Sequence, residues 1–418
     1  MKEFTRYRYT AIIILIIVAV IVLFTKCVNQ DTVETGIIKN FKGKKFAGSA
    51  TCASCHKSIY DTHVKTAHFL TSGIASGDNI RGSFETGKNT VAYDRHNVVT
   101  MEKRDSSFYQ VEYRSGIQKN IQRIDITVGS GTMGQSYLYW AGNQLFQLPV
   151  SYFGSANEWS NNPGFPNQVI FNRFITSRCL ECHSTFAKTL SPPDVDPEKF
   201  DRTQLIYGVD CEKCHGPAED HVAFQTENPT AKTARYITNP ARLSRQQNMD
   251  LCSSCHGGRL YKNKPSFSFT AGDTLSHFFN LDTGLPDPTN IDVHGNQNGL
   301  LRASKCFRMS ETLNCNTCHN THVSEKGNTA LFSQRCMSCH NPDHGPICKM
   351  SATLGAAIKN NCIDCHMPLK PSRKIAVFLP GATAATAAMI RSHLISIYPD
   401  ETNKMLAFIK KPGLKPSK

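Results

Sequence analysis

Long hydrophobic runs and dense charge are both scarce in this chain of 418 residues. Hydrophobic residues make up 40% of it and charged residues 19%, and the mean hydropathy is −0.34. These values exclude a membrane protein with many spanning helices and a disordered polyelectrolyte. At roughly 150 residues per domain, the length predicts a water-soluble body of two or three domains.

A nucleic-acid-binding pattern is also lacking. The 47 Lys and Arg residues exceed the 33 Asp and Glu residues, which gives a formal net charge of +14. No basic run is interleaved with aromatic residues, however, as nucleic-acid binding would require. We therefore expect no nucleic-acid partner, and the positive charge needs another explanation.

Cysteine, by contrast, is abundant. The chain has 17 cysteines, an odd number that cannot form a closed disulfide framework. Fourteen of them fall into seven copies of Cys-x-x-Cys-His, whereas roughly 0.03 copies are expected by chance. The motifs, numbered one to seven in chain order, are Cys52–His56, Cys179–His183, Cys211–His215, Cys252–His256, Cys315–His319, Cys336–His340 and Cys362–His366.

Cys-x-x-Cys-His is the attachment signature of haem c. Two thiols at this spacing reach the two vinyl groups of one porphyrin, and the adjoining imidazole coordinates the iron. We therefore expect seven covalent haem c groups. The predicted attachment residues are Cys52, Cys55, Cys179, Cys182, Cys211, Cys214, Cys252, Cys255, Cys315, Cys318, Cys336, Cys339, Cys362 and Cys365. The predicted proximal iron ligands are His56, His183, His215, His256, His319, His340 and His366.

Zinc sites and disulfides explain the motifs less well. Zinc sites need no histidine directly after every second cysteine, and seven pairs cannot be divided evenly among four-thiolate sites. A thioredoxin-like pair would occur once. The haem interpretation also accounts for the charge, because two propionates on each of seven haems bring fourteen negative charges against the excess of +14.

The amino terminus carries the one long apolar run, residues 11–24, which Lys2, Arg6 and Arg8 precede. Its fourteen residues would span about 21 Å as a helix, short for a bilayer core of about 30 Å. No small residues in an A-x-A arrangement follow it, which favours an uncleaved anchor over a signal peptide. Cys27 admits lipidation as an alternative, although Lys26 before it disfavours a lipobox. The basic residues predict a cytoplasmic amino terminus, an inner-membrane anchor and a periplasmic body.

The sequence divides into regions that differ in composition and periodicity. Residues 1–27 are expected to be the amino terminus with its anchor, 28–46 a tether, 47–400 a multihaem domain and 401–418 a basic tail. Within the domain, period-two alternation over about 88–155 predicts a small antiparallel β subdomain. The intervals between the later motifs are too short to bury a core of their own, so the haems must supply it. We expect a mainly α fold with extensive loops, packed around the haems.

Several stretches resemble the multihaem cytochrome c family that includes the electron acceptor of hydroxylamine oxidoreductase and its larger membrane-tethered relatives. The resemblance covers nearly all of residues 47–397. The matching stretches are Gly48-Ser-Ala-Thr-Cys52 with Thr66-Ala-His68, Gln144-Leu-Phe-Gln-Leu-Pro149-Val, Cys179-Leu-Glu-Cys-His-Ser-Thr185, Gly208-Val-Asp-Cys211 through His221, Ser304-Lys305, Cys315 through His322, Cys362 through Pro368, and Arg391-Ser-His393. Cys306 departs from the pattern, and it leaves Cys306 and Cys348 either paired in a disulfide or each unpaired as a buried small hydrophobic residue.

Nine histidines lie outside the motifs and are candidates for the second axial position of the irons. The resemblance implies distal ligands at His68, His221, His322 and His393, with His294 and His344 as further candidates. His63 is expected to line a haem edge or hold a propionate, and His96 and His277 to be structural. Nine histidines are enough in number to close all seven irons.

The leading hypothesis is electron transfer. Two imidazoles close both axial sites of an iron, so a chain with seven closed irons would carry single electrons between redox protein partners of respiration. The rival is an oxidoreductase that acts on a small nitrogen or sulfur compound at one open haem. No Cys-x-x-Cys-Lys motif is present, which counts against a pentahaem nitrite reductase. A third hypothesis makes the protein a docking subunit of a respiratory complex, with the β subdomain as its interface.

Overall fold

The structure is a computed structural model that describes residues 37–192, 195–280, 290–341, 343, 348–350 and 355–409. The chain divides into two units, Met1–Ile38 and Lys39–Lys418. The predicted anchor at 11–24, Cys27, most of the tether and His344 lie outside the described residues. Within the described ranges, no helix has the length and apolar character needed to cross a membrane.

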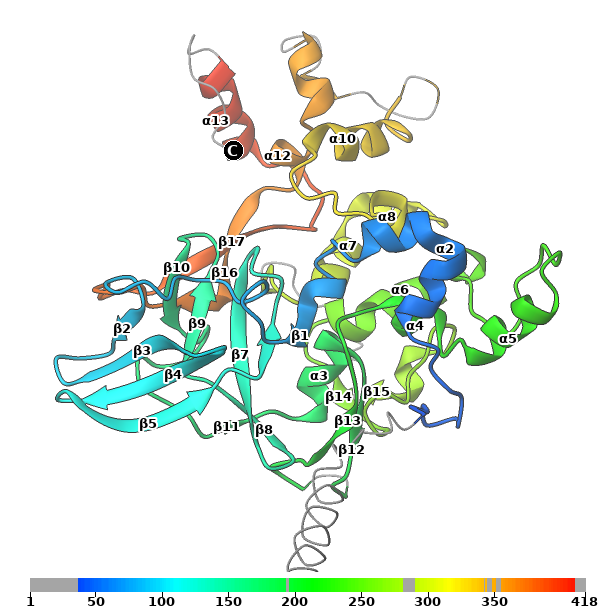
Figure 1. The fold of residues 1–418 in the computed structure, drawn as a ribbon. Coiled ribbons are helices and arrows are strands. Elements are labelled where there is room, and N and C mark those ends of the chain that lie inside the picture. The colour runs from blue at the N-terminus through cyan, green and yellow to red at the C-terminus, as the bar shows by residue number, and fades with distance from the viewer. Residues whose placement is uncertain are drawn as a thin grey trace, which may run out of the picture. The chain divides into compact units, whose positions relative to one another are not determined.

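The expectation of a mainly α fold is wrong, because the structure is 28% helix and 26% strand. Most helices at the motifs are short, and four of the seven have only four to seven residues. The segments between motifs, which the sequence analysis treated as loops, contain paired strands. Strand pairing satisfies the backbone N–H and C=O groups of these connections where the helices are too short to do so. The protein is therefore a mixed α and β structure (Figure 1).

Two antiparallel sheets lie between motifs one and two, where β structure was predicted, and they extend past residues 88–155 on both sides (Figure 1). The seven-stranded sheet consists of β1 (Ser72–Ile74), β6 (Ile126–Val128), β7 (Gly134–Ala141), β8 (Gln144–Gln147), β9 (Val150–Phe153), β10 (Glu158–Asn161) and β11 (Arg173–Phe174). The four-stranded sheet consists of β2 (Thr90–Ala92), β3 (Asn97–Arg104), β4 (Ser107–Arg114) and β5 (Ile117–Arg123).

The core of this β region follows from the period-two pattern. Val99 and Met101 of β3 are fully buried, and they join Tyr137, Leu148 and Trp159 in one apolar cluster. Burying a side chain of this size contributes about 2 kcal/mol. Tight turns keep the strands in register, since β4 and β5 are joined by two residues with positive φ, Ser115 at 49° and Gly116 at 78°, as a type I′ hairpin requires.

In the part of the chain that the structure describes, the remaining strands form three two-stranded sheets in the connections. They are β12 (Ser184–Thr189) with β13 (Phe200–Tyr207), β14 (Tyr261–Lys262) with β15 (Phe279–Asn280), and β16 (Leu369–Val377) with β17 (Thr386–Arg391). The first pair joins motifs two and three, the second lies between motifs four and five, and the third follows motif seven.

Helices carry the motifs and surround the cavity described below. The α-helices are α2 (Ser49–His63), α3 (Ser177–His183), α4 (Cys211–His215), α5 (Glu219–Glu227), α6 (Arg245–His256), α7 (Gln297–Ala303), α8 (Lys305–Met309), α9 (Cys315–Cys318), α10 (Thr329–Met337), α12 (Ile363–His366) and α13 (Pro399–Ile409). The 3-10 helices are η1 (Phe69–Thr71), η2 (Pro240–Arg242), η3 (Leu275–His277) and η4 (Gly355–Asn360). The predicted tail at 401–418 thus begins inside α13.

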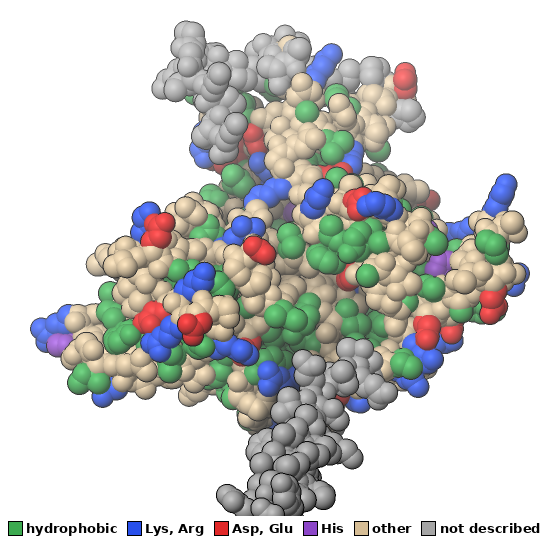
Figure 2. Space-filling model, viewed as in Figure 1, with side chains coloured by type: hydrophobic (Ala, Val, Ile, Leu, Met, Phe, Trp, Pro, Cys, Tyr) green, Lys and Arg blue, Asp and Glu red, His purple; other side chains and the backbone are tan. Residues whose placement is uncertain are grey.

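Residues 39–48 of the second unit pack on the helical part, although most of them were predicted to be tether. Lys44 pairs with Asp220 and Lys45 with Glu219, while the Glu212 carboxylate accepts hydrogen bonds from the backbone N–H groups of Ala47 and Gly48. Figure 2 shows hydrophobic side chains gathered near α2 and α7, whereas charged side chains of both signs are intermixed over the β strands.

Candidate functional site

Five of the seven motifs meet at one cavity of about 1860 Å³. A pocket for a single small ligand has a volume of about 300–1,000 Å³, so this space suits several large groups. Cysteine and histidine side chains of motifs one to four line it, together with His319 of motif five. The cations Lys65, Arg81 and Lys213 line it too, which suits the carboxylates that porphyrins carry.

Motif one lies in the first half of α2, and the other motifs lie in short helices or at the C-terminal end of a helix. Nearby residues fix where several of these helices begin. The Asp210 carboxylate accepts a hydrogen bond from the Cys211 backbone N–H and caps α4. Ser244 caps α6 through a capping box with Gln247. Such caps stabilise a short helix by about 1 kcal/mol each. In α2 the backbone departs from helical geometry at His56, the proximal histidine of motif one.

Thiols of different motifs contact one another in four places. A hydrogen bond from Cys182 lowers the pKa of the Cys255 thiol to about 5, and one from Cys336 lowers the pKa of Cys362 to about 6. In the same way, a hydrogen bond with Cys211 lowers the pKa of the Cys52 thiol, and a hydrogen bond with Cys252 lowers the pKa of the Cys315 thiol. Motif one therefore adjoins motif three, two adjoins four, four adjoins five, and six adjoins seven.

Two further contacts between motifs connect all seven into one series. Burial raises the pKa of Cys214 to about 11, with a smaller contribution from the charge of neighbouring Cys255, so motif three adjoins motif four. Burial also raises the pKa of Cys318 in motif five, and the charges of Cys306 and of Cys339 in motif six add to this. The motifs thus form a continuous series in the order one, three, four, five, six, seven, with motif two beside motif four.

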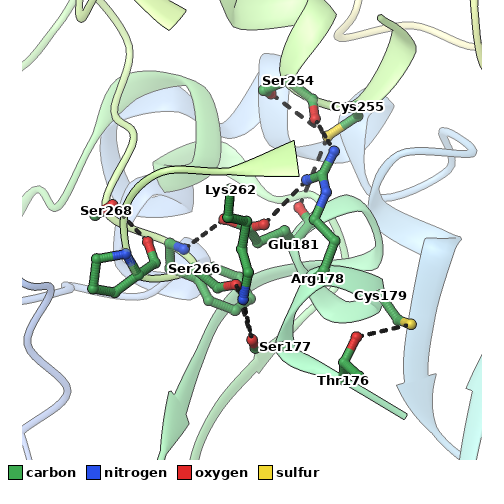
Figure 3. A network of polar contacts seen from close by, with 12 residues as sticks. Thr176, Ser177, Arg178, Cys179, Glu181, Ser254, Cys255, Lys262, Ser266 and Ser268 are labelled. Carbon is green, nitrogen blue, oxygen red and sulfur yellow. Dashed lines mark hydrogen bonds and ion pairs between the residues drawn. The ribbon is translucent and has the colours of Figure 1, made fainter. Parts of the chain in front are cut away.

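A polar network locks motifs two and four together (Figure 3). The Arg178 guanidinium donates to the Glu181 carboxylate at 3.1 Å and to the Ser254 carbonyl at 3.0 Å. Glu181 also accepts from the backbone N–H of Phe267 at 2.7 Å. Lys262 donates to the hydroxyls of Ser177 and Ser266 (Figure 3). These contacts fix α3 against α6 and its following loop, and so fix the distance between the two attachment sites.

Histidines from distant segments lie opposite one another in pairs. The ring centroids are 6.2 Å apart for His68 and His256, 6.1 Å for His215 and His322 and 6.1 Å for His319 and His393. A metal bonded to one nitrogen of each of two imidazoles, at about 2 Å, separates the ring centroids by roughly 6 Å. Each pair is therefore spaced as the two axial ligands of one iron.

The protonation of these histidines suits iron ligation. Burial lowers the pKa of His68 and of His393 to about 4. Burial likewise lowers the pKa of His183 to about 4, and the charge of the neighbouring His294 adds to the effect. At neutral pH the imidazoles are uncharged, and the neutral form is the one that binds metal.

Backbone carbonyls fix the orientation of several rings. The Nδ1 atom of His215 lies 2.9 Å from the Thr238 carbonyl oxygen, that of His221 lies 2.9 Å from Arg235, and that of His366 lies 2.8 Å from Ser396. A carbonyl oxygen can only accept, so Nδ1 carries the proton and Nε2 is left to bind iron. No sequence pattern identifies these acceptors, because every residue type has a backbone carbonyl.

The structure separates the nine histidines outside the motifs. His68, His221, His294 and His322 line the cavity, and His393 faces His319. His96 is exposed in a β hairpin beside Ser115, and His277 is exposed at the end of η3. Both were expected to be structural. His344 lies outside the described residues.

His63 occupies a different position from the other histidines. Its side chain is buried, and neither ring nitrogen has a hydrogen-bond partner. Its Nε2 lies 3.6 Å from the Asp210 carboxylate, and its ring centroid lies 6.1 Å from that of His322. His63, Asp210 and Cys211 form a group with the spacing of metal ligands, but Cys211 belongs to motif three, so the group is part of the haem-binding site.

Cys306 and Cys348 are both free thiols in the structure, half-buried and exposed respectively. Of the two states that the sequence left open, the structure therefore has the unpaired one. Cys306 lies on α8, and its charge reaches Cys318 and Cys336 of the neighbouring motifs.

Comparisons with known proteins agree with this geometry. The family model described as cytochrome c554 and c-prime matches residues 167–216, which contain motifs two and three. The multiheme cytochrome MtrA of Shewanella baltica (strain OS185) is 26% identical over 191 residues, which are 45% of this chain and 51% of that protein. The chain thus matches about half the length of this curated relative.

Among solved structures, the crystal structure of the outer cell wall cytochrome OcwA resembles the chain with a TM-score of 0.52. The likeness covers 86% of this chain and 81% of the other at 15% identity, so it concerns the fold alone. The thiol pairs, the neutral imidazoles and the cationic lining of the cavity fit haem c. Together these observations support a multihaem c-type cytochrome that binds covalent haem c.

Proposed function

We propose that this chain is a heptahaem electron-transfer cytochrome whose body lies in the periplasm, tethered to the inner membrane by residues 11–24, and that it passes single electrons between redox protein partners of respiration. The observation that carries the proposal is the continuous series of motifs. Every motif contacts or adjoins another, and motif four has motifs two, three and five as neighbours.

Haem c, when bound, supplies the one-electron iron couple. The chain supplies position and ligands. The cysteines attach one group to each motif, and Arg178, Glu181 and Lys262 keep motifs two and four at a fixed separation. The imidazoles of His68, His183 and His393 are uncharged at neutral pH, which leaves them able to close axial positions.

Haem stoichiometry and electron redistribution test the electron-transfer proposal. Mass spectrometry of protein matured in a competent host should give the polypeptide mass plus seven haems. After a pulse that delivers one electron per molecule, we expect a spectral relaxation as the electron redistributes. The variant Cys252→Ala/Cys255→Ala, which lacks the central group, should lose most of this relaxation. The matched variant Cys179→Ala/Cys182→Ala should keep it, because motif two lies beside the series. Equal relaxation in both variants would refute the series.

Fractionation tests the proposed location. Cells that produce the full chain should contain the haem protein in the membrane fraction, and cells that produce a version with a cleavable periplasmic signal in place of residues 1–27 should release it in soluble form from the periplasm. A soluble full-length haem protein, or a membrane-bound truncated one, would contradict tethering by this run.

A further inference from the structure

The two C-terminal motifs, Cys336–His340 and Cys362–His366, are neighbours whose ligand supply differs from that of the others. They do not line the large cavity, and the thiols of Cys336 and Cys362 contact one another. Each motif provides one proximal histidine. Two closed irons at this end of the chain would therefore require two more histidines within reach.

The 418 residues do not supply them. Of 16 histidines, seven belong to motifs, which leaves nine. Four of the nine face other motifs: His68 faces His256, His322 faces His215, His393 faces His319, and His294 neighbours His183. The assignment of His393 is decisive, because in the sequence it follows motif seven, yet it lies across from motif five.

Four more histidines are placed away from the terminal pair. His63 contacts His322 and Asp210, and His221 lies close to His215, so both belong to the surroundings of motifs one and three. His96 and His277 are exposed on a β hairpin and on η3. Only His344, which stands between the two motifs in the sequence, remains for two irons.

We infer that one of the two irons held by motifs six and seven has no histidine at its second axial position, and that this position admits a small exchangeable ligand such as cyanide or nitric oxide. Met337 lies between the two attachment cysteines of motif six, and Met367 directly follows the proximal histidine of motif seven. Both are thereby held on the proximal side, where they do not reach the opposite face. Cys339 and His340 are exposed to solvent, so motif six lies at the surface of the protein.

This inference rests on the proposed heptahaem function and adds a reactive position at one end of the motif series. The distinction from the other motifs is chemical. A closed iron only accepts and releases electrons, whereas an iron with an exchangeable ligand binds small nitrogen-containing molecules and anions. The class of ligand is therefore a small diatomic or anionic donor.

Spectroscopy of the full-length protein tests the inference. Once mass spectrometry has established seven haems, the ferric protein should show a high-spin signal equal to one haem per molecule, and cyanide should convert it to low spin. The variant His393→Gln, which opens the iron of motif five, should show two such haems, and His277→Gln should show one. A seven-haem protein with only low-spin signals that cyanide leaves unchanged, or with the near-infrared band of a methionine ligand, overturns the inference. Fewer than seven haems would instead contradict the proposed function.

Variants that lack one motif at a time locate the exchangeable axial position. The signal should disappear in either Cys336→Ala/Cys339→Ala or Cys362→Ala/Cys365→Ala and persist in the matched variant Cys179→Ala/Cys182→Ala. If only the motif-two variant loses the signal, the exchangeable position lies elsewhere and the inference is wrong. The wild-type measurement decides the main point even where a variant does not fold.

Discussion

Arg178 joins two motifs through charge. Its side chain is 23% exposed and that of Glu181 is 7% exposed, so the carboxylate is almost fully withdrawn from water. Glu181 is held in place by the Phe267 backbone as well. An ionised carboxylate in such a position requires its partner, since an unpaired buried charge is costly.

Removal of this guanidinium should destabilise the protein. The variant Arg178→Met leaves Glu181 without its counter-charge, and we expect the free energy of unfolding to fall by about 3 kcal/mol. Denaturant unfolding of the holoprotein measures it. The exposed pair Lys57 and Asp61, with side chains 77% and 49% exposed, provides the control, and Lys57→Met should change stability by less than about 0.5 kcal/mol. Equal effects in the two variants would contradict a structural role for the buried pair.

Glu325 predicts a pH dependence. A hydrogen bond from Arg335 lowers its pKa below 4.5, and Arg335 also donates to the Cys318 carbonyl, which ties motif six to motif five. The stabilisation is present above the unfolded pKa of 4.5 and is lost as pH falls through the lower folded value. Glu325→Gln should therefore be less stable than wild type by about 2 kcal/mol near neutral pH, and the difference should shrink well below pH 4.5.

Urea unfolding of Glu325→Gln and of wild type, at neutral pH and well below pH 4.5, measures this difference in the free energy of unfolding. Glu85→Gln, which breaks an exposed pair with Lys88, should show no difference at either pH. If the loss of stability in Glu325→Gln is the same at low and neutral pH, the carboxylate charge is not its cause.

At the scale of single residues, the sequence predicts the attachment site but not the iron pairs. Each thiol pair and its proximal histidine belong to one pentapeptide, so local spacing is sufficient to find them. The distal partner comes from a remote segment, as with His68 and His256 or His319 and His393. No local pattern encodes which of them meet, and a count of histidines does not show how they are distributed among the motifs.

Gly208 lies at the end of the strand pair between motifs two and three, where the backbone passes close to the segment that carries His68. Its φ is +68°, and a Cβ there would run into the carbonyl of Phe69, directly after His68. The neighbouring Val209 donates a backbone hydrogen bond to the His68 carbonyl at 2.8 Å. Glycine is required because it alone allows both the backbone conformation and the close approach.

The substitution Gly208→Ala should displace His68 from His256. We expect one of the low-spin ferric signals to be lost, together with destabilisation of about 1–3 kcal/mol from strain at positive φ. Electron paramagnetic resonance and denaturant unfolding measure the two effects. Gly116→Ala, at φ +78° with open space around it, should share the strain and retain every low-spin signal. A retained His68 signal in Gly208→Ala would show that the close contact does not position this ligand.

At the scale of elements, the long hairpins were predictable and the linker strands were not. Strand β3 alternates between buried and half-buried residues, and turn residues separate it from β4, which is the pattern that predicts a hairpin. Strand β12 has four consecutive buried residues, and β16 contains a proline, so neither alternates. Their pairing depends on motif helices on either side, which local periodicity does not reveal.

The molecule as a whole should be less basic than its polypeptide. The sequence has an isoelectric point of about 9.0, and each attached haem adds two propionates. Isoelectric focusing of the holoprotein should therefore give a value below 9.0, and a variant that lacks one motif should shift back toward it. A holoprotein with seven haems that focuses at or above 9.0 would mean that the propionates are neutralised inside the cavity by protonation.

The contact between Cys336 and Cys362 has a consequence for biogenesis. Two thiols that touch across different motifs are a ready disulfide in an oxidising compartment, and that crosslink would block attachment at both motifs at once. The Cys362 thiol, with its pKa of about 6, is largely thiolate at neutral pH and is the more reactive partner. Haem attachment at these two motifs therefore requires that both thiols are still reduced when the haems are added.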